Sequence, residues 1–507
     1  MEYVIEMNHI TKQFGNFKAN DDITLQVKKG EIHALLGENG AGKSTLMSGL
    51  YQPEEGEIRI NGKTVNINNP NDANDLGIGM VHQHFKLVHN FTVLESIVLG
   101  RETTKMGVLK MDAARKKVME LSEKYKFKID PDAYISDITV GMQQRVEILK
   151  MLYCDNDILI FDEPTAVLTP QEISELMKVM KQLIAEGKSI IFITHKLNEI
   201  KEVANRCSVL RKGKYIGTVE VAETSKEQMS EMMVGRKVNF IVDKPEMTPG
   251  EPVLEVKNLT VKSRHHGKAA VDNVSFQVRK GEILCVAGID GNGQSELVYG
   301  ITGLIPIEHG QVILNGKDIT KESIRQKCLD GVAHIPEDRH KDGLVLDYTL
   351  QENLVLQSYY TRRFQNHGFL KFDAIRQYAK MLIEKFDIRS SQGEKSIARG
   401  MSGGNQQKAI IARELDRNPA IVIAVQPVRG LDVGAIEYIH KQLIEQRDAG
   451  KAVLLVSLEL DEVMNVSDRI IVMYEGEIVA DLDPKKITTE ELGLYMAGAK
   501  RSVKNED

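Results

Sequence analysis

The sequence has few cysteines, no long apolar stretch and little excess of either charge, and each absence argues against a class of protein. Only 4 of the 507 residues are cysteine, and none forms a CxxC or other metal-binding spacing. This favours a reducing, cytoplasmic compartment over a disulfide framework. No stretch reaches about 18 apolar residues, so no membrane-spanning helix is expected. The first residues, MEYVIEMNHITKQF, lack the basic region and the apolar region that a signal peptide has, so none is expected. The net charge is −6, and no polybasic block suggests nucleic-acid binding.

Internal repetition is the most informative feature that is present. With 507 residues, 42% of them hydrophobic, the chain is expected to form two or more globular domains. DDITLQVKKGEIHALLGENGAGKSTL, from Asp21, is similar to VDNVSFQVRKGEILCVAGIDGNGQSEL, from Val271. VGMQQRVEILKML, from Val140, is similar to GGNQQKAIIAREL, from Gly403. A repeat of this length indicates two similar domains.

The joint between the two halves is predicted in VDKPEMTPGEP, which is rich in proline and charge. It gives a first domain at 1–241, a linker at 242–252, a second domain at 253–498 and a polar tail at 499–507. In each half, continuous apolar stretches such as EIHALLG and DILIFD alternate with helical segments that have charged outer faces. This alternation predicts an α/β fold in both halves.

A phosphate-binding loop is the clearest motif of the first half. GENGAGKST, Gly37–Thr45, fits G-x-x-x-x-G-K-[ST], follows an apolar strand-like stretch and opens a predicted helix. Its glycines let backbone N–H groups close on phosphate oxygens, and the helix start adds partial positive charge. Lys43 is predicted to reach the β- and γ-phosphates, and Ser44 to bind Mg²⁺. The alternative, a glycine-rich turn without a ligand, is disfavoured by this context.

Two carboxylates follow a second apolar stretch, ILIF. Asp162, at its end, is predicted to hold Mg²⁺ through water, and Glu163 to polarise the attacking water. Beside an upstream phosphate loop, these roles are favoured over two solvated acids at a strand end.

Five motifs then occur in order: GENGAGKST, VHQHF, VGMQQRVEILK, FDEPTAVLT and ITHKLNE. In this combination the chain resembles, twice over, the nucleotide-binding domain of ATP-binding-cassette (ABC) proteins. The resemblance implies two tandem P-loop ATPase domains, each with a mainly parallel core sheet, an antiparallel β-subdomain and a helical subdomain that carries the signature motif. It also implies ATP and Mg²⁺ as ligands, with nucleotide sandwiched between the phosphate loop of one domain and the signature of the other.

The resemblance assigns further roles by position. Gln83 matches a glutamine that touches Mg²⁺ and couples to a membrane partner, and His195 matches a histidine that contacts the γ-phosphate. Phe14 stands where an aromatic ring stacks on adenine, with Phe17 as the alternative. The implied catalytic residues are Lys43, Gln83, Glu163 and His195, and the implied metal ligands are Ser44, Gln83 and Asp162. The implied nucleotide contacts are Phe14, Gly37, Glu38, Asn39, Gly40, Ala41, Gly42, Lys43, Ser44, Thr45, Ser402, Gly403, Gly404, Gln406 and Asp432.

The second half lacks the groups that the chemistry needs. Its loop, GIDGNGQSE, has Gln294 in place of the lysine, and a neutral amide does not supply a cation's field. Val425 offers no oxygen ligand, Gln426 is not a base, and Leu458 replaces the histidine. Pro336–Glu337 stands near the expected glutamine. Glycines and a serine that could cradle phosphate remain, so binding without hydrolysis and no binding at all both stay open. The predicted degenerate site comprises Gly288, Gly293, Gln294, Ser295, Val425, Gln426 and Leu458.

The signature motifs show the opposite pattern. MSGGNQQ of the second half keeps Ser402, Gly403 and Gly404, whereas ITVGMQQ of the first half has Thr139 and Val140 in the corresponding places. The segment RGLD of the second half ends in an acid, and its counterpart AVLT does not. In a head-to-tail sandwich the intact parts of both halves would form one site, and the altered parts the other. The pattern predicts an internal pseudo-dimer with one competent composite ATP site.

The fused pair with a degenerate second site looks like the ATPases of sugar and nucleoside importers. The resemblance implies a peripheral protein at the cytoplasmic face of the membrane, with two permease subunits and an extracellular substrate-binding (lipo)protein as partners. GMQQRVEILKMLY, DEPTAVLTPQEI and EDRHKDGLVLDYTLQENL look more like the nucleoside branch than the ribose or galactose branch. A sugar importer of the ribose, galactose or xylose type is the alternative. A two-cassette protein acting on ribosomes is a further one, although such proteins usually keep both sites complete.

Overall fold

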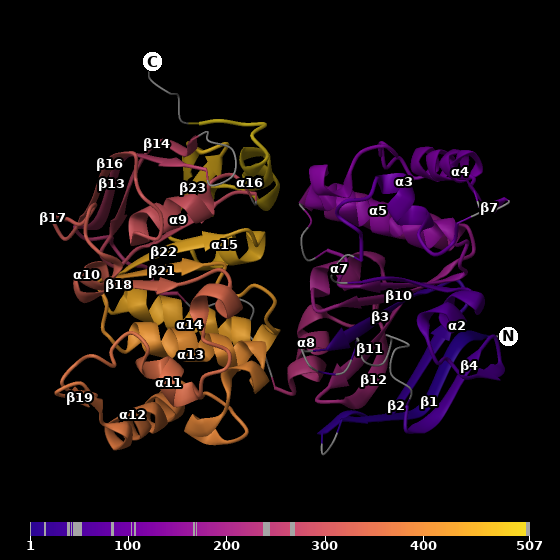
Figure 1. The fold of residues 1–507 in the computed structure, drawn as a ribbon, viewed down its shortest axis with the longest axis horizontal. Coiled ribbons are helices and arrows are strands. Elements are labelled where there is room, and N and C mark those ends of the chain that lie inside the picture. The colour runs from indigo at the N-terminus through magenta and orange to yellow at the C-terminus, as the bar shows by residue number, and fades with distance from the viewer. Residues whose placement is uncertain are drawn as a thin grey trace. The chain divides into compact units, whose positions relative to one another are not determined.

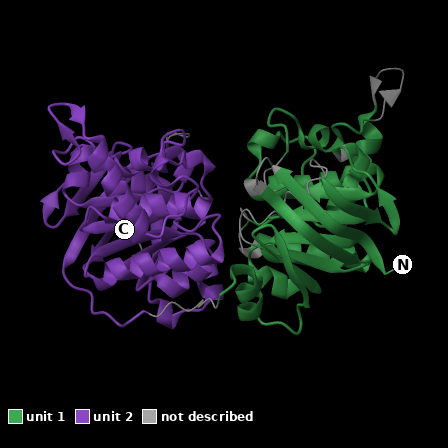
Figure 2. Cartoon of the chain, turned by 90° about the horizontal axis from the view of Figure 1, so that it is seen from below, with its two compact units in different colours: residues 1–238 green, residues 239–507 purple. Residues whose placement is uncertain are grey.

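The computed structural model divides the chain into two compact units, Met1–Val238 and Asn239–Asp507 (Figure 2). The two units are described separately below. The structure describes residues 2–14, 17–37, 41, 43, 53–82, 86–102, 104–105, 108–165, 168, 170–236, 244–263, 269–289 and 291–502.

The first unit is built on a ten-stranded sheet. Its strands, in order across the sheet, are β5 (Lys63–Val65), β4 (Glu55–Ile60), β1 (Tyr3–Phe14), β2 (Phe17–Lys28), β12 (Lys214–Glu220), β11 (Arg206–Arg211), β3 (Ile32–Gly37), β10 (Ser189–Thr194), β9 (Ile158–Asp162) and β6 (Ile78–Val81). Strands β11, β3, β10, β9 and β6 run parallel, and β5, β4, β1 and β2 run antiparallel. Strands β3, β9 and β10 are buried along their whole length, as parallel strands covered on both faces are.

Helices of the first unit pack on this sheet and at its end. They are α2 (Pro70–Asp75), α3 (Val93–Val98), α4 (Met111–Lys124), α5 (Val140–Tyr153), α6 (Pro170–Ala185), α7 (Leu197–Val203) and α8 (Lys226–Val234). A two-stranded hairpin, β7 (Thr104–Lys105) and β8 (Val108–Leu109), precedes α4. Helices α3, α4 and α5 gather at one end of the unit (Figure 1), where their apolar residues share a core with α6. Helix α5 begins at the N-cap Thr139, whose side chain accepts from the N–H of Met142, so the first-half signature position opens a helix.

The second unit repeats this plan with its sheets separated. The parallel core has the order β18 (Val332–Ile335), β21 (Ile421–Val425), β22 (Ala452–Ser457), β15 (Ile283–Ala287), β23 (Arg469–Tyr474), with β24 (Glu477–Leu482) antiparallel at its edge. An antiparallel sheet contains β14 (Ala269–Arg279), β13 (Pro252–Lys262), β16 (His309–Leu314) and β17 (Lys317–Asp318), and a hairpin contains β19 (Gln365–Asn366) and β20 (Phe369–Leu370). The α/β architecture and the antiparallel subdomain are therefore as the sequence predicted.

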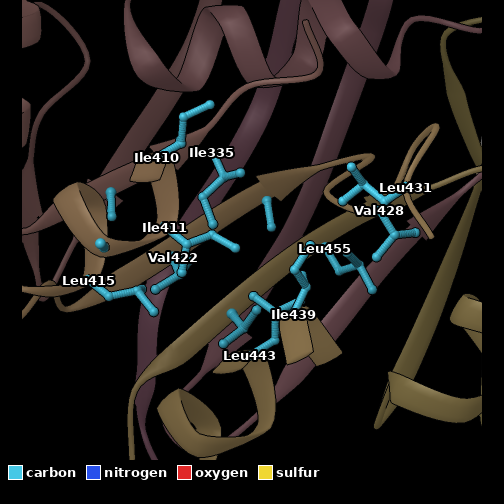
Figure 3. Packing of buried hydrophobic residues seen from close by; sticks show 14 of the residues in the cluster. Ile335, Ile410, Ile411, Leu415, Val422, Val428, Leu431, Ile439, Leu443 and Leu455 are labelled. Carbon is cyan, nitrogen blue, oxygen red and sulfur yellow. The ribbon is translucent and has the colours of Figure 1, made fainter. Parts of the chain in front are cut away.

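Helices of the second unit follow the same arrangement. They are α9 (Gln294–Thr302), α10 (Ile324–Leu329), α11 (Leu350–Val355), α12 (Phe372–Lys385), α13 (Gly403–Leu415), α14 (Val433–Asp448), α15 (Leu460–Val466) and α16 (Thr489–Met496). Figure 3 shows α13 and α14 packing on the core strands through Ile410, Ile411, Ile439 and Leu443. The same cluster contains Val428 and Leu431, which follow β21. One core thus fixes the start of α13 and the segment after β21 together.

The described part of the predicted linker packs on the second unit. Lys244 donates to the carbonyls of Val466 and Ser467 over 3.2 and 2.6 Å, and lies 3.0 Å from the carboxylate of Asp468. The units divide between Val238 and Asn239, close to the predicted end of the first domain. Among the residues that the structure describes, no helix combines the length and apolar character needed to cross a bilayer.

Candidate functional site

Three neighbouring strands of the first unit end where the predicted catalytic residues lie. β3 ends at the phosphate loop, β9 ends at Asp162, and His195 follows β10. Because β10 pairs in parallel with both β3 and β9, their carboxyl ends meet at one edge of the sheet. A Cβ on Gly37 would lie 2.6 Å from the carbonyl oxygen of Leu210 in β11, so only glycine fits at this strand end.

Lys43 lies close to the end of β3. Its Nζ donates to the carbonyl of Gly37 over 2.7 Å, and only 5% of the residue's surface is exposed. Ala41 of the same loop is buried. The side chains of Phe14 and Phe17 fall outside the description. So do the remaining predicted residues of the loop and of the coupling position, which are Glu38, Asn39, Gly40, Gly42, Ser44, Thr45 and Gln83.

Glu163 and His195 are in direct contact. His195 Nδ1 lies 3.3 Å from Glu163 Oε1, within hydrogen-bond range. Glu163 has a φ of +45°, in the left-handed region that residues other than glycine rarely adopt. Its N–H donates to the carbonyl of Ile193 in β10 over 2.9 Å. Backbone strain of this kind persists only where the surrounding structure holds it, which is common at functional positions.

The charge of Glu163 is set by its neighbours. Burial raises the pKa of its carboxyl, but the hydrogen bond and charge attraction from His195, together with Lys43 and Lys196, outweigh burial and hold the pKa below its ordinary value. The group is therefore ionised at neutral pH, the form in which a carboxylate accepts a proton or orients a water molecule.

The second unit keeps the backbone of this site. Gln426 has a φ of +43°, and its N–H donates to the carbonyl of Val456 in β22 over 2.7 Å, as the N–H of Glu163 does in β10. Gly288 follows β15, and Gly293, with a φ of +99°, precedes the first residue of α9. The backbone conformation at this strand end is therefore retained where Gln426 replaces Glu163.

The side chains at the four substituted positions of the second site, Gln294, Val425, Gln426 and Leu458, are neutral. Gln294 is 5% exposed, and its Nε2 donates to the carbonyl of Ile289 over 3.1 Å. Val425 ends β21 and is 3% exposed, and the half-buried Leu458 follows β22. At these four positions the second unit has no cation, carboxylate or imidazole, the groups predicted to act in the first half.

The intact signature and the segment Arg429–Asp432, called the D-loop here, form one surface of the second unit. Ser402 stands at the N-cap position of α13, where its Oγ accepts from Asn405 Nδ2 over 2.8 Å, and Gly403 and Gly404 form the first turn. Asp432 caps α14, accepting from the N–H of Ala435 over 2.8 Å. A Cβ on Gly404 would lie 3.2 Å from the Cβ of Ala435, so the two helix starts are in close contact.

Gln406, predicted among the nucleotide contacts, is turned into the unit. Its Nε2 donates to the carbonyl of Ala398 over 2.9 Å, and its Oε1 lies 2.9 Å from His340 Nε2. Only 4% of the residue's surface is exposed. Both ends of this amide are engaged inside the second unit, so the surface of the signature is formed by Ser402, Gly403 and Gly404 and not by Gln406.

Two further residues belong to the second site: Glu337, which the sequence placed only near the expected glutamine, and Arg429. Glu337 follows β18, and its carboxylate accepts from Gln426 and from Arg429. The sequence does contain a sign of this pair. Arg429 stands where the first half has Ala166, so the second half gains a cation as well as the anion Glu337.

The comparisons with known proteins agree with this architecture. Residues 20–166 and 271–428 each match the family described as ABC transporter. The chain belongs to the ABC transporter family and carries the family's matched segment twice.

Among its curated relatives, the chain is 57% identical over 500 residues to the nucleoside import ATP-binding protein NupA of Lactococcus lactis subsp. cremoris. It is 57% identical over 502 residues to the guanosine import ATP-binding protein NupO of Bacillus subtilis. Both alignments cover 98% of this chain and 98% of the relative. The ribose import ATP-binding protein RbsA of Caldanaerobacter subterraneus subsp. tengcongensis is 38% identical over 503 residues, covering 98% of this chain and all of the relative (100%).

Proposed function

We propose that this chain is the ATP-hydrolysing subunit of a nucleoside importer. The observation that carries the proposal is the contact between the ionised Glu163 and His195 at a strand edge that also holds Lys43. The second half retains the same backbone without these groups. Relatives named for nucleoside and guanosine import are 57% identical over 98% of both chains, against 38% for the ribose relative, which favours a nucleoside over a sugar.

The proposed chemistry takes place in one composite site. Gly37–Thr45 receives the triphosphate, and Lys43 offsets its charge at the β- and γ-phosphates. Glu163, held ionised, orients and deprotonates the attacking water, and His195 positions the Glu163 carboxylate. In the proposed sandwich, Ser402–Gly404 and Asp432 close the site from the second half, and Phe14 stacks on adenine.

A magnesium ion fits the oxygen donors of this site. Asp162 ends β9 with its carboxylate buried beside Glu163, and carboxylate and hydroxyl oxygens are the ligands that Mg²⁺ prefers. Asp162, Ser44 and Gln83 would hold the ion, which when bound neutralises charge on the phosphate oxygens.

The partners in this proposal are two permease subunits and an extracellular substrate-binding protein, with the chain at the cytoplasmic face of the membrane. A cavity of about 760 Å³ in the first unit suits a permease segment, because His82 and Lys86, which line it, flank the segment that contains Gln83. The N–H of Lys86 donates to Glu147 over 2.6 Å, and Lys150 donates to the carbonyl of Lys86 over 3.2 Å. Both partners belong to α5, so a segment bound here would act directly on the helix that begins at the first signature position.

Uptake measurements test the substrate class. A strain without this chain is expected to lose uptake of radiolabelled guanosine and to keep uptake of ribose. Complementation with the native chain restores guanosine uptake, and complementation with Glu163→Gln does not. Loss of ribose uptake alone would assign the chain to a sugar importer, and co-sedimentation with ribosomes instead of membranes would contradict the importer.

The asymmetry of the two halves can be tested at Gln426. Replacing Gln426 with alanine is expected to lower ATP turnover by no more than a few fold, because a general base, worth about 10²–10⁴-fold, is already missing at this position. Steady-state phosphate release by the purified chain measures the effect. A collapse comparable with that of a first-half base variant would show that both sites hydrolyse ATP.

A further inference from the structure

Glu337 occupies the centre of the second phosphate site. Its Oε1 accepts from Gln426 Nε2 over 2.8 Å and from Arg429 Nη1 over 2.6 Å. Its Oε2 accepts from the Oγ of Ser295 over 3.1 Å. The side chain is 19% exposed, so the carboxylate is largely enclosed by these donors.

The donors identify the place that Glu337 fills. Ser295 is the loop serine, the counterpart of the residue predicted to bind Mg²⁺ in the first half. Gln426 is the counterpart of the predicted base, with the same backbone conformation. A carboxylate that bridges these two side chains stands between the positions where a metal ion and the attacking water would be in a competent site. Both donors are used within the protein.

The charges of the second site oppose a bound triphosphate. The loop has lost its lysine to Gln294, whose amide is tied to the carbonyl of Ile289. Glu337 adds a negative charge beside the loop serine, and the guanidinium of Arg429 is already paired with it. A phosphate group that entered the loop would meet a like charge. Placing like charges side by side lowers binding affinity by about tenfold or more.

The residues that follow Glu337 hold the D-loop and the signature of the second unit. Arg339 Nη1 donates to the carbonyl of Arg429 in the D-loop over 3.0 Å. The other end of the same guanidinium lies against the signature, since a Cβ on Gly403 would be 3.1 Å from Arg339 Nη2. His340 contacts Gln406, one turn into α13. The D-loop and signature are thus tied to the Glu337 segment by contacts within the second unit.

We infer that Glu337 closes the second phosphate loop to Mg²⁺–nucleotide, and that the segment it begins holds this half's signature and D-loop in place. The chain therefore carries one nucleotide in its working cycle. This inference rests on the proposed function, in which the first half's loop is the one that binds ATP.

Counting bound nucleotide tests the inference. The full-length chain with Glu163→Gln, which blocks hydrolysis, is dialysed to equilibrium against radiolabelled ATP and Mg²⁺, and one nucleotide per chain is expected. Adding Glu337→Gln removes the charge while keeping an acceptor oxygen. This double variant is expected to bind a second nucleotide, with an affinity at least about tenfold above that of the second loop with Glu337.

The control is Asp347→Asn in the same background. It removes the same charge from an exposed side chain that pairs with Arg399 over 2.7 Å, and a count of one is expected. A count of two with native Glu337, or a count that stays at one in the Glu337→Gln variant, would overturn the inference. A chain that binds no nucleotide would instead refute the proposed function, so the two failures are distinguishable.

Discussion

Replacing Glu163 with glutamine is expected to lower ATP turnover by about 10²–10⁴-fold, the contribution typical of a general base. The amide keeps the size and polarity of the side chain but takes no proton. It also removes the charge that His195, Lys43 and Lys196 stabilise, as the lowered pKa of Glu163 indicates. Phosphate release by the purified chain measures the loss. Binding of fluorescent ATP is expected to persist, because the phosphate loop and Lys43 are unchanged.

The matched comparison is Gln426→Ala, since Gln426 has the backbone conformation of Glu163 in the other half. A large loss at Glu163 and a small one at Gln426 is the expected pair of results. If Glu163→Gln retained more than about a tenth of native turnover, another group would have to act as the base, because the amide cannot. Loss of nucleotide binding together with turnover would point to unfolding of the loop and not to chemistry.

Much of the fold was predictable because local and global preferences agree. The stretch IHALLG became the fully buried β3, and ILIF with Asp162 became β9. The helical segments that alternate with these stretches include α4 and α6, whose apolar residues share one core. Parallel strands that are covered on both faces are continuously apolar. Apolar stretches of five or six residues between charged segments therefore predict the parallel core of an α/β fold.

The direction in which a motif's side chains point was harder to predict from the sequence. Gln406 was assigned to the nucleotide because it follows the signature glycines, yet its contacts are internal. Helical spacing explains this, since residue 406 lies one turn before Ile410 on the face of α13 that packs on the core strands. A motif defines which residues are adjacent in the chain, and the period of the helix decides which of them face outward.

Glu337 could not be assigned from the sequence because its role depends on three segments far apart in the chain. Ser295, Gln426 and Arg429 reach it from the loop and from the end of β21. The sequence showed only that charges had moved: a lysine, two acids and a histidine lost, and Glu337 and Arg429 gained. That the gained pair lies where the lost groups would act required the pairing of β18 with β21.

Replacing Gly403 with valine is expected to lower ATP turnover by roughly 100-fold or more, although Gly403 lies in the half that lacks the predicted base and lysine. In the proposed sandwich, the bare backbone at the start of α13 donates to the phosphates, and losing one such donor typically costs about 10²–10³-fold. The substitution copies into the intact signature the residue that the first half has at this position, Val140. The second unit is expected to keep its fold, because the new Cβ would meet only the flexible end of Arg339, at 3.1 Å.

The reciprocal variant, Val140→Gly, makes this test specific to the geometry of the composite site. It restores a glycine to the first-half signature, which in the sandwich faces the second phosphate loop, where Gln294 and Gln426 leave no chemistry to assist. Turnover is therefore expected to change by less than a few fold, and thermal unfolding of both variants by only a few degrees. If Gly403→Val and Val140→Gly had equal effects, the halves would not divide the work as proposed. If only Val140→Gly lowered turnover, the first half's phosphate loop would be closed by the first half's signature. The presence of the intact loop in one half and the intact signature in the other would then not reflect a shared site.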